Sequence, residues 1–404
     1  MSLRYTANQM RRRSSAFSLP WHPVAPVLIT ILTVGGVVPT PRARADEVRI
    51  HGEVGGEYDD NVHWVGTSDT PGEPPPTGSA LARAVLGVTT AARLSARQDV
   101  AFSVLGAAKL FEKAEARSEN LAVVETSGAW RVAVADGTRL SLNGGYYEAI
   151  QAGTAAERYL SGVARDFRSL SPTLRIVRAM GSSSSLALAS GYRWFVYKPL
   201  PAYDFGAPVL TVEYQYAHET LDGAAEWDAT AAAGVELRNF RGIRLVPQSP
   251  CPAAPCTAVP DPRGDAHTDQ FVGGRLDITR TGRMLVGGGY SIQWNRSNSY
   301  SETLVRHAAT LRLTAPLPFG LYLAARVELV LVLYPDRAAF PTGPSGQLLA
   351  TIEDENRTQL RAELSRDLTR RLQLVLRYSL YVNAIGQNSY QRQTSTLALA
   401  FSLD

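Results

Sequence analysis

The chain has 404 residues and a formal net charge of +4, with two cysteines and six histidines. The positive charge comes from residues 1–45, which carry six arginines and no acid, so residues 46–404 have a net charge of −2. This balance gives no support for binding of nucleic acid. No run of 18 apolar residues follows residue 45, so the sequence predicts no transmembrane helix.

Residues 1–45 have the pattern of a secretory signal peptide. Three arginines at 11–13 form a positive region, residues 24–38 form an apolar core, and Ala-Arg-Ala at 43–45 is a small-x-small cleavage site. The apolar run is shorter than the roughly 20 residues of a membrane-spanning helix. We therefore expect export of a mature chain that begins at Asp46.

After residue 45, apolar side chains alternate with polar ones along nearly the whole chain. The clearest segment is 371–384, where large apolar side chains stand at every second position from Leu372 to Val382. Successive side chains of a strand point to opposite faces, so this segment has one apolar and one polar face. The pattern predicts strands at about residues 48–58, 80–95, 98–111, 119–134, 138–150, 157–180, 185–197, 207–220, 226–245, 267–280, 284–298, 303–315, 319–333, 352–367, 371–384 and 390–403.

The connections between these strands alternate in length, as in outer-membrane barrels with short turns on one side and longer loops on the other. We predict that residues 46–404 form a single antiparallel transmembrane β-barrel of about 16 strands. Segment 157–180 is too long for one regular strand, so 14 or 18 strands are alternatives. A soluble β-sandwich would also alternate, but with its apolar face inside. The signal peptide, the long set of strands and the last strand favour a barrel surrounded by outer-membrane lipid.

The last strand carries a pattern of its own. Leu397, Leu399 and Phe401 share one face of residues 395–404, and smaller residues share the other. This resembles the C-terminal signal of bacterial outer-membrane barrels, although Phe401 is not the final residue. The resemblance implies recognition by the barrel assembly machinery.

Charged residues occupy the polar face of many of these strands. A charge costs several kcal/mol on a lipid face near the midplane, so we expect these side chains to point into the barrel. The predicted pore-lining bases are Arg83, Arg93, Lys109, Arg131, Arg193, Arg238, Arg275, Arg312, Arg326, Arg361 and Arg377. The acids on the same face are Glu213, Asp228, Glu236, Asp277, Glu328 and Glu363.

Two interpretations of this charged face remain open. It forms a mildly cationic, water-filled passage for polar or anionic solutes, or its residues pair with one another and fill a narrow interior. The alternative function is a barrel that transports nothing and acts as an adhesin or partner-binding surface protein. It would use the predicted long loops 59–79, 246–266 and 334–351.

Chemistry other than transport has little support in the sequence. Cys251 and Cys256 lie in a Pro-rich loop, and in an exported protein they predict a local disulfide. Two thiolates without nearby histidines do not supply four zinc ligands, so we expect no metal there. No histidine after residue 45 has a serine two positions later, the arrangement of barrel phospholipases and lipid A deacylases. We expect neither an enzyme nor a cofactor, and rank a barrel hydrolase third.

The segment Gly55-Gly56-Glu57-Tyr58-Asp59-Asp60-Asn61-Val62 resembles the opening strand of the β-barrel porin 2 group. That group includes barrels encoded with exopolysaccharide secretion machinery. The resemblance implies an integral barrel that helps polysaccharide cross the outer membrane together with a periplasmic export apparatus. The inner arginines would then meet acidic sugars, and Tyr147, Tyr322 and Tyr381 would offer stacking faces. In the alternative interpretation, Asp59, Asp60 and Asn61 only begin an external loop.

Overall fold

The computed structural model describes residues 45–62, 76–151, 166–198, 200–219, 225–249, 256, 258–300, 302–335, 358–383 and 390–403. Apart from its last residue, the predicted signal peptide lies outside this part of the chain and stays a prediction. None of the helices in the described residues has the length and apolar character needed to cross a membrane.

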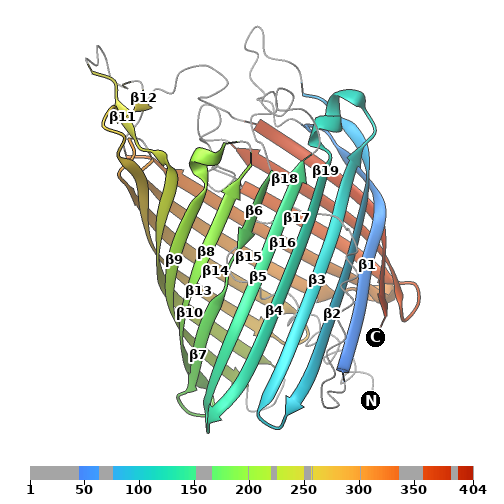
Figure 1. Ribbon diagram of the computed structural model, residues 1–404. Helices are drawn as coiled ribbons and strands as arrows, with labels where there is room; N and C mark the ends of the chain where they lie inside the picture. The colour runs from blue at the N-terminus through green and yellow to red at the C-terminus, as the bar shows by residue number, and fades with distance from the viewer. Residues whose placement is uncertain are drawn as a thin grey trace, which may run out of the picture.

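The described residues form one large antiparallel sheet (Figure 1). Its strands are β1 (Ala45–Asp59), β2 (Ser79–Ser95), β3 (Gln98–Phe111), β4 (Leu121–Ala135), β5 (Thr138–Gln151), β6 (Phe167–Leu170), β7 (Thr173–Ala179), β8 (Ser184–Tyr197), β9 (Phe205–Glu219), β10 (Glu226–Ile243), β13 (Ala266–Thr281), β14 (Leu285–Ser297), β15 (Leu304–Pro316), β16 (Leu321–Leu333), β17 (Thr358–Asp367), β18 (Leu372–Asn383) and β19 (Tyr390–Leu403). β1 pairs with both β2 and β19, which closes the sheet into a barrel. Closure leaves no unpaired sheet edge.

The barrel has 16 strand positions, because β6 and β7 share one position between β5 and β8. The break between them falls at Ser171 and Pro172, where the proline has no backbone N–H to donate to the sheet. This explains the excess length of the predicted segment 157–180, whose residues 157–165 lie outside the described chain. The predicted barrel of 16 strands is confirmed, and the alternatives of 14 and 18 are excluded.

Most predicted strand limits agree with the structure, and two differ for local reasons. The segment predicted to begin at residue 119 begins at Leu121, because Ala114–Glu119 forms a 3-10 helix, η1. The backbone N–H of Phe111 then donates to the Asn120 side chain at 2.7 Å. The strand predicted at residues 226–245 also ends early. β10 ends at Ile243, and a separate antiparallel pair of short strands, β11 (Leu245–Pro247) and β12 (Ala258–Pro260), follows.

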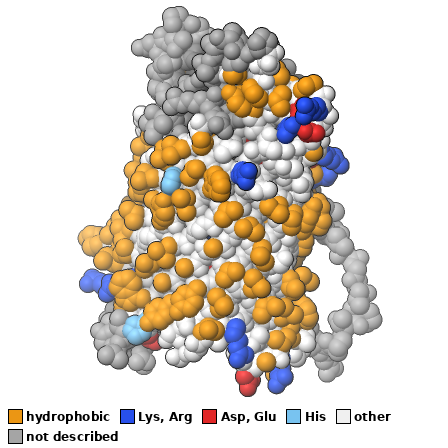
Figure 2. Space-filling view, turned by 90° about the vertical axis from the view of Figure 1, so that its left-hand side faces the viewer, with side chains coloured by type: hydrophobic (Ala, Val, Ile, Leu, Met, Phe, Trp, Pro, Cys, Tyr) orange, Lys and Arg blue, Asp and Glu red, His pale blue; other side chains and the backbone are white. Residues whose placement is uncertain are grey.

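The outer face of the wall is apolar. Large exposed side chains alternate along each strand, such as Leu186 and Leu188 on β8 and Leu329 on β16. Figure 2 shows hydrophobic side chains spread over one side of the barrel, with charged side chains mostly near its two ends. The apolar face therefore points outward, opposite to a β-sandwich.

The two ends of the barrel differ. One end has short turns, such as Asp136-Gly137, where Gly137 takes a positive φ of 67° that suits a two-residue hairpin. It also holds the 3-10 turn η3 (Pro318–Gly320). The other end has the longer connections with η1, η2 (Pro201–Tyr203) and the β11–β12 hairpin (Figure 1). The C-terminus and the start of β1 lie at the short-turn end (Figure 1).

Candidate functional site

The inner face of the barrel gathers the charged residues singled out in the sequence. Cross-strand register places Arg83 beside Lys109, Arg312 beside Arg326, and Arg326 beside Arg361. Alternation along each strand puts the other predicted pore-lining residues and the predicted acids on this face as well. Their surroundings differ, however, and divide them into buried pairs and exposed side chains.

One buried cluster lies where the first and last strands meet. Glu57 of β1 accepts hydrogen bonds from Lys109 Nζ at 2.5 Å and from an Arg83 terminal nitrogen at 3.1 Å. Glu53, two inner positions earlier, accepts two bonds of 3.0 Å from Arg377. Arg83, Lys109 and Arg377 are therefore parts of the wall, held by the buried Glu57 and the largely buried Glu53. For these three residues, the interpretation as paired interior residues fits better than an exposed pore lining.

The segment that resembles the porin 2 opening strand also acts at this seam. Asp59 pairs with Arg392 of β19, the Asp60 carboxylate accepts a 2.6 Å bond from the Gln393 backbone N–H, and the Asn61 side chain donates to the Gln391 carbonyl at 2.9 Å. These three side chains thus join β1 to β19. The interpretation that these residues only begin an external loop does not explain their bonds to β19.

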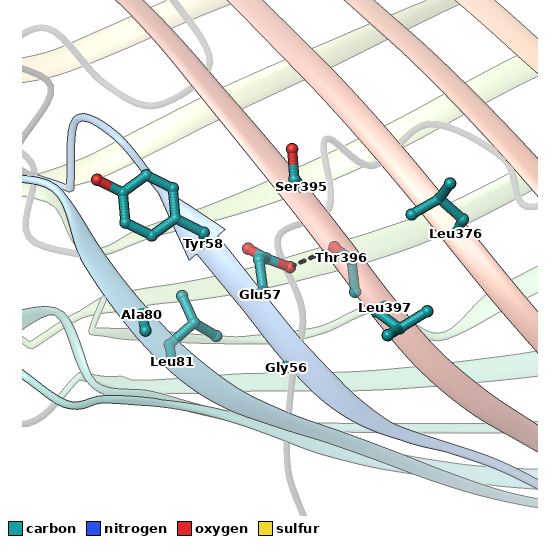
Figure 3. A pocket seen from close by; sticks show the side chains of 9 residues that line it. All are labelled: Gly56, Glu57, Tyr58, Ala80, Leu81, Leu376, Ser395, Thr396 and Leu397. Atoms are coloured by element: carbon teal, nitrogen blue, oxygen red, sulfur yellow. Dashed lines mark hydrogen bonds between the residues drawn. The ribbon is translucent and has the colours of Figure 1, made fainter.

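Figure 3 shows the same seam from close by. The Thr396 hydroxyl donates to Glu57 at 3.0 Å. On the outer side, Tyr58, Leu376 and Leu397 line a shallow apolar hollow around Gly56. Charge lies on one side of the seam and apolar surface on the other.

A second paired cluster lies on the opposite part of the wall. Glu236 binds Arg193 at 2.5 Å and Arg238 at 2.8 Å, and both guanidiniums lie within about 5 Å of the Phe205 ring centre. Glu213 binds Arg175 at 2.7 Å and Arg275 at 3.3 Å. The predicted residues Arg193, Arg238 and Arg275 are therefore held by acids as well.

Three arginines form an exposed row on the inner wall. Arg312, Arg326 and Arg361 are direct register neighbours on β15, β16 and β17. Their side chains are 38 %, 54 % and 44 % exposed, which is far more than the buried bases at the seam. Glu328 binds Arg326 at 2.8 Å, and Glu363 binds Arg361 at 3.3 Å. We call Arg312, Arg326 and Arg361 the arginine row.

The remaining predicted bases lie near the short-turn end. Arg131 binds Asp99 at 2.9 Å in an exposed pair, and Arg93, opposite Asp99 in register, is exposed. Because such exposed pairs are worth little to stability, these residues give no sign of a dedicated site.

Aromatic side chains form a second feature of the inner wall. Tyr147 stacks on Phe167 with ring centres 5.3 Å apart, Phe167 meets Phe195 at 5.3 Å, and Phe195 stacks on Phe205 at 5.0 Å. Phe240 continues the series at 5.2 Å from Phe205. Tyr322 and Tyr381 also lie on the inner face, at register positions beside Ser365 and Gln359.

Several charged residues of the inner wall were missed in the sequence. Among them are Glu53, Arg175, Arg306 and Arg392, and Glu57 and Asp59 were noted only as parts of the motif. On β1 a usable signal exists, since Glu47, Glu53, Glu57 and Asp59 all fall at odd positions. Glycines at 52, 55 and 56 weaken the apolar alternation of that strand and hide its polar face.

The structure does not test the predicted assembly signal or the predicted disulfide. Leu397, Leu399 and Phe401 lie on the outer face of β19, and Phe401 is opposite Gly52, but their role as an assembly signal stays a prediction. Cys251 lies outside the described residues, so its predicted bond to Cys256 also stays a prediction. Residues 63–75, 250–255, 257 and 336–351, which make up much of the predicted long loops, lie outside as well. So do residues 352–357, which were predicted to begin the strand that ends at residue 367.

Comparisons with known proteins return structures only. No known family matches the sequence, and no curated protein matches it. Among solved structures, the outer membrane channel DcaP of Acinetobacter baumannii is 12 % identical, with 88 % of this chain and 97 % of that chain covered at a TM-score of 0.47. An anion-selective porin from Comamonas acidovorans is 10 % identical, with 88 % and 99 % covered at a TM-score of 0.45.

Proposed function

We propose that this chain is an outer-membrane channel that favours polar, anionic solutes. The apolar outer wall supports the membrane placement, because a closed barrel satisfies its backbone hydrogen bonds internally and meets lipid with apolar side chains. The signal peptide expected at residues 1–45 supports export to that membrane.

The arginine row carries the proposal of anion preference. Like charges placed directly opposite each other on neighbouring strands destabilise a sheet. Here three guanidiniums occupy adjacent positions, and their acidic neighbours, Asp277, Glu328 and Glu363, leave them substantially exposed. Water and passing anions relieve this repulsion, so the row is suited to contact with anionic solutes.

The test is ion conduction by the purified barrel in a planar lipid bilayer. We expect discrete conductance steps and a reversal potential in a salt gradient that indicates a preference for anions. Absence of conductance from correctly folded protein would contradict the channel and favour the surface-binding alternative. Conductance without anion preference would contradict the role of the arginine row alone.

Polysaccharide export is a second candidate, favoured by the aromatic series from Tyr147 to Phe240. Sugar rings stack on aromatic faces, and acidic sugars would also suit the arginine row. A deletion strain assayed for secreted glycan tests it. Loss of surface polysaccharide, restored by the wild-type gene, would support export with a periplasmic apparatus as partner, and normal polysaccharide would remove it.

A further inference from the structure

A histidine and two acids meet on the inner wall at the long-loop end of the barrel. His267 and Asp269 stand two residues apart on β13, and Glu302 lies in the connection between β14 and β15. His267 Nε2 lies 2.9 Å from Asp269 Oδ1 and 3.1 Å from Glu302 Oε2. His267 and Asp269 are buried, and Glu302 is half-buried. This cluster belongs to neither the arginine row nor the seam.

The surroundings hold these ligand atoms in place. The His267 ring stacks on Phe240, with ring centres 4.0 Å apart and planes 3° from parallel. The Ser299 hydroxyl donates to Glu302 Oε1 at 3.2 Å, which leaves Oε2 directed at the histidine. The three side chains therefore converge without needing to rearrange.

The cluster has more acceptors than its one histidine can satisfy. Nε2 carries at most one hydrogen, yet it faces Asp269 Oδ1, Glu302 Oε2 and the Ser297 hydroxyl at 3.3 Å. Within the described residues, Asp269 and Glu302 form ion pairs with His267 alone. Two carboxylates therefore share one imidazole.

The arginine closest in register to this cluster is held by another acid. Arg238, the register partner of Asp269, binds Glu236 at 2.8 Å and lies over the Phe271 ring at 3.9 Å. The phenol of Tyr203 also faces the cluster. Burial and the nearby acids Glu302 and Asp269, together with Tyr197, raise the pKa of Tyr203, which keeps it neutral.

An unpartnered oxygen lies beside the same connection. The Asn295 side chain is 2 % exposed, and its Nδ2 donates to the Glu302 carbonyl at 3.0 Å. Its Oδ1 is buried and has no hydrogen-bond partner among the described residues. A buried amide oxygen without a donor costs about 1–3 kcal/mol, so a ligand that uses it would be favoured.

We propose that His267, Asp269 and Glu302 bind a divalent transition-metal ion of the zinc class. One imidazole nitrogen with carboxylate oxygens is a zinc ligand set, whereas Ca²⁺ and Mg²⁺ prefer oxygen alone. Bonds of about 2.1 Å in a tetrahedral site place ligand atoms roughly 3.4 Å apart. The two distances from His267 Nε2 are 2.9 and 3.1 Å, and all three ligand atoms lie within 4.8 Å of one another. The fourth position is left for water.

Binding of the metal would have a structural consequence. The ion would fasten the connection between β14 and β15 to the inner face of β13, and it would replace the hydrogen on His267 Nε2. The inference goes beyond the proposed channel function and stands without it.

The experiment uses folded protein in detergent, purified without a histidine tag and stripped of metal by a chelator. Zn²⁺ is titrated by calorimetry, and Co²⁺ is added separately to record its visible absorption. We expect one Zn²⁺ per chain with a dissociation constant of about 1 µM or lower. The variants His267→Ala, Asp269→Asn and Glu302→Gln should each weaken binding by about tenfold or more.

The matched control is His307→Ala, since this histidine lies on β15 on the outer face and bonds to Tyr290. It should leave Zn²⁺ binding unchanged. Circular dichroism of each variant confirms that the barrel has folded. No binding below about 100 µM, or unchanged binding in folded His267→Ala and Glu302→Gln, would overturn the proposal.

Discussion

The carboxylate of Asp59 binds the guanidinium of Arg392 inside the wall, although the two residues are 333 positions apart. Arg392 Nε lies 3.0 Å from each oxygen of Asp59, and a terminal nitrogen of Arg392 bonds to Oδ2 as well. Asp59 is 0 % exposed and Arg392 is 6 % exposed. The first strand and the last strand are thus joined by a buried charge pair at the long-loop end.

Removing one partner of this pair should destabilise the barrel strongly. Asp59→Ala leaves a buried guanidinium without its carboxylate, which costs about 3–5 kcal/mol. Urea unfolding of the protein in lipid vesicles, followed by tryptophan fluorescence, measures the free energy of unfolding.

The matched control is Asp99→Ala, which removes the acid of another Asp–Arg pair on the inner wall. That pair is about 42 % exposed, so its loss should cost between about 0 and 1 kcal/mol. Equal losses in the two variants would show that burial does not set the strength of these pairs.

Two arginines that look equivalent in the sequence should respond differently to charge reversal. Arg326 is 54 % exposed in the arginine row, so Arg326→Glu should lower anion preference in the bilayer while the barrel still folds. Arg377 is 8 % exposed between Glu53 and Glu363, so Arg377→Glu would place three acids together with little access to water and prevent stable folding.

The two readouts are the reversal potential and the yield of folded barrel. A folded Arg377→Glu barrel with shifted selectivity would mean that Arg377 contacts the solute directly. Unchanged ion selectivity in Arg326→Glu would mean that the arginine row does not contact the ions that pass through the barrel.

The strands and the facing of their side chains could be predicted from alternation alone. Arg326 of β16 was assigned to the inner face from sequence, and the structure places it there, with Leu329 of the same strand on the outer face. Alternation fixes the face because the side-chain period of a strand is two residues. Alternation does not show which residues lie opposite one another on neighbouring strands. It therefore could not predict which arginines form buried pairs and which are exposed.

The contacts among His267, Asp269 and Glu302 could not be predicted from the sequence either. His267 and Asp269 are close in sequence, but Glu302 belongs to the connection that follows the next strand, β14, which brings the chain back to the same end of the barrel. Asp59 and Arg392 need the whole barrel to close before they meet. Contacts that depend on closure have no local signature in the sequence.

Neighbouring glycines on β1 offer a sharp test of the seam. A Cβ on Gly55 would overlap the Leu397 carbonyl and come within 2.7 Å of Ala398, both on β19. Gly55→Ala should therefore force β1 away from β19 and cost about 1–3 kcal/mol. A Cβ on Gly56 meets nothing within 4 Å, so Gly56→Ala should be close to neutral.

Electrophoresis before and after heating separates folded from unfolded barrels and measures both variants. Wild-type stability in Gly55→Ala would mean that the two strands are further apart at this point. Loss of folding in Gly56→Ala would point to a requirement for the outer hollow at the seam.

The outward direction of the apolar face can be tested with two adjacent residues. Leu329 of β16 is on the outer face and Val330 is on the inner face. Leu329→Arg would put a charge into lipid and should cost about 2–4 kcal/mol if the site is near the midplane. Val330→Arg would place the same charge in the water-exposed interior, so its effect on vesicle stability should be much smaller. Both substitutions introduce arginine in place of an aliphatic side chain, and the positions are adjacent, so the direction of the side chain is the main difference between them. A greater loss of unfolding free energy in Val330→Arg would require the apolar face to point inward.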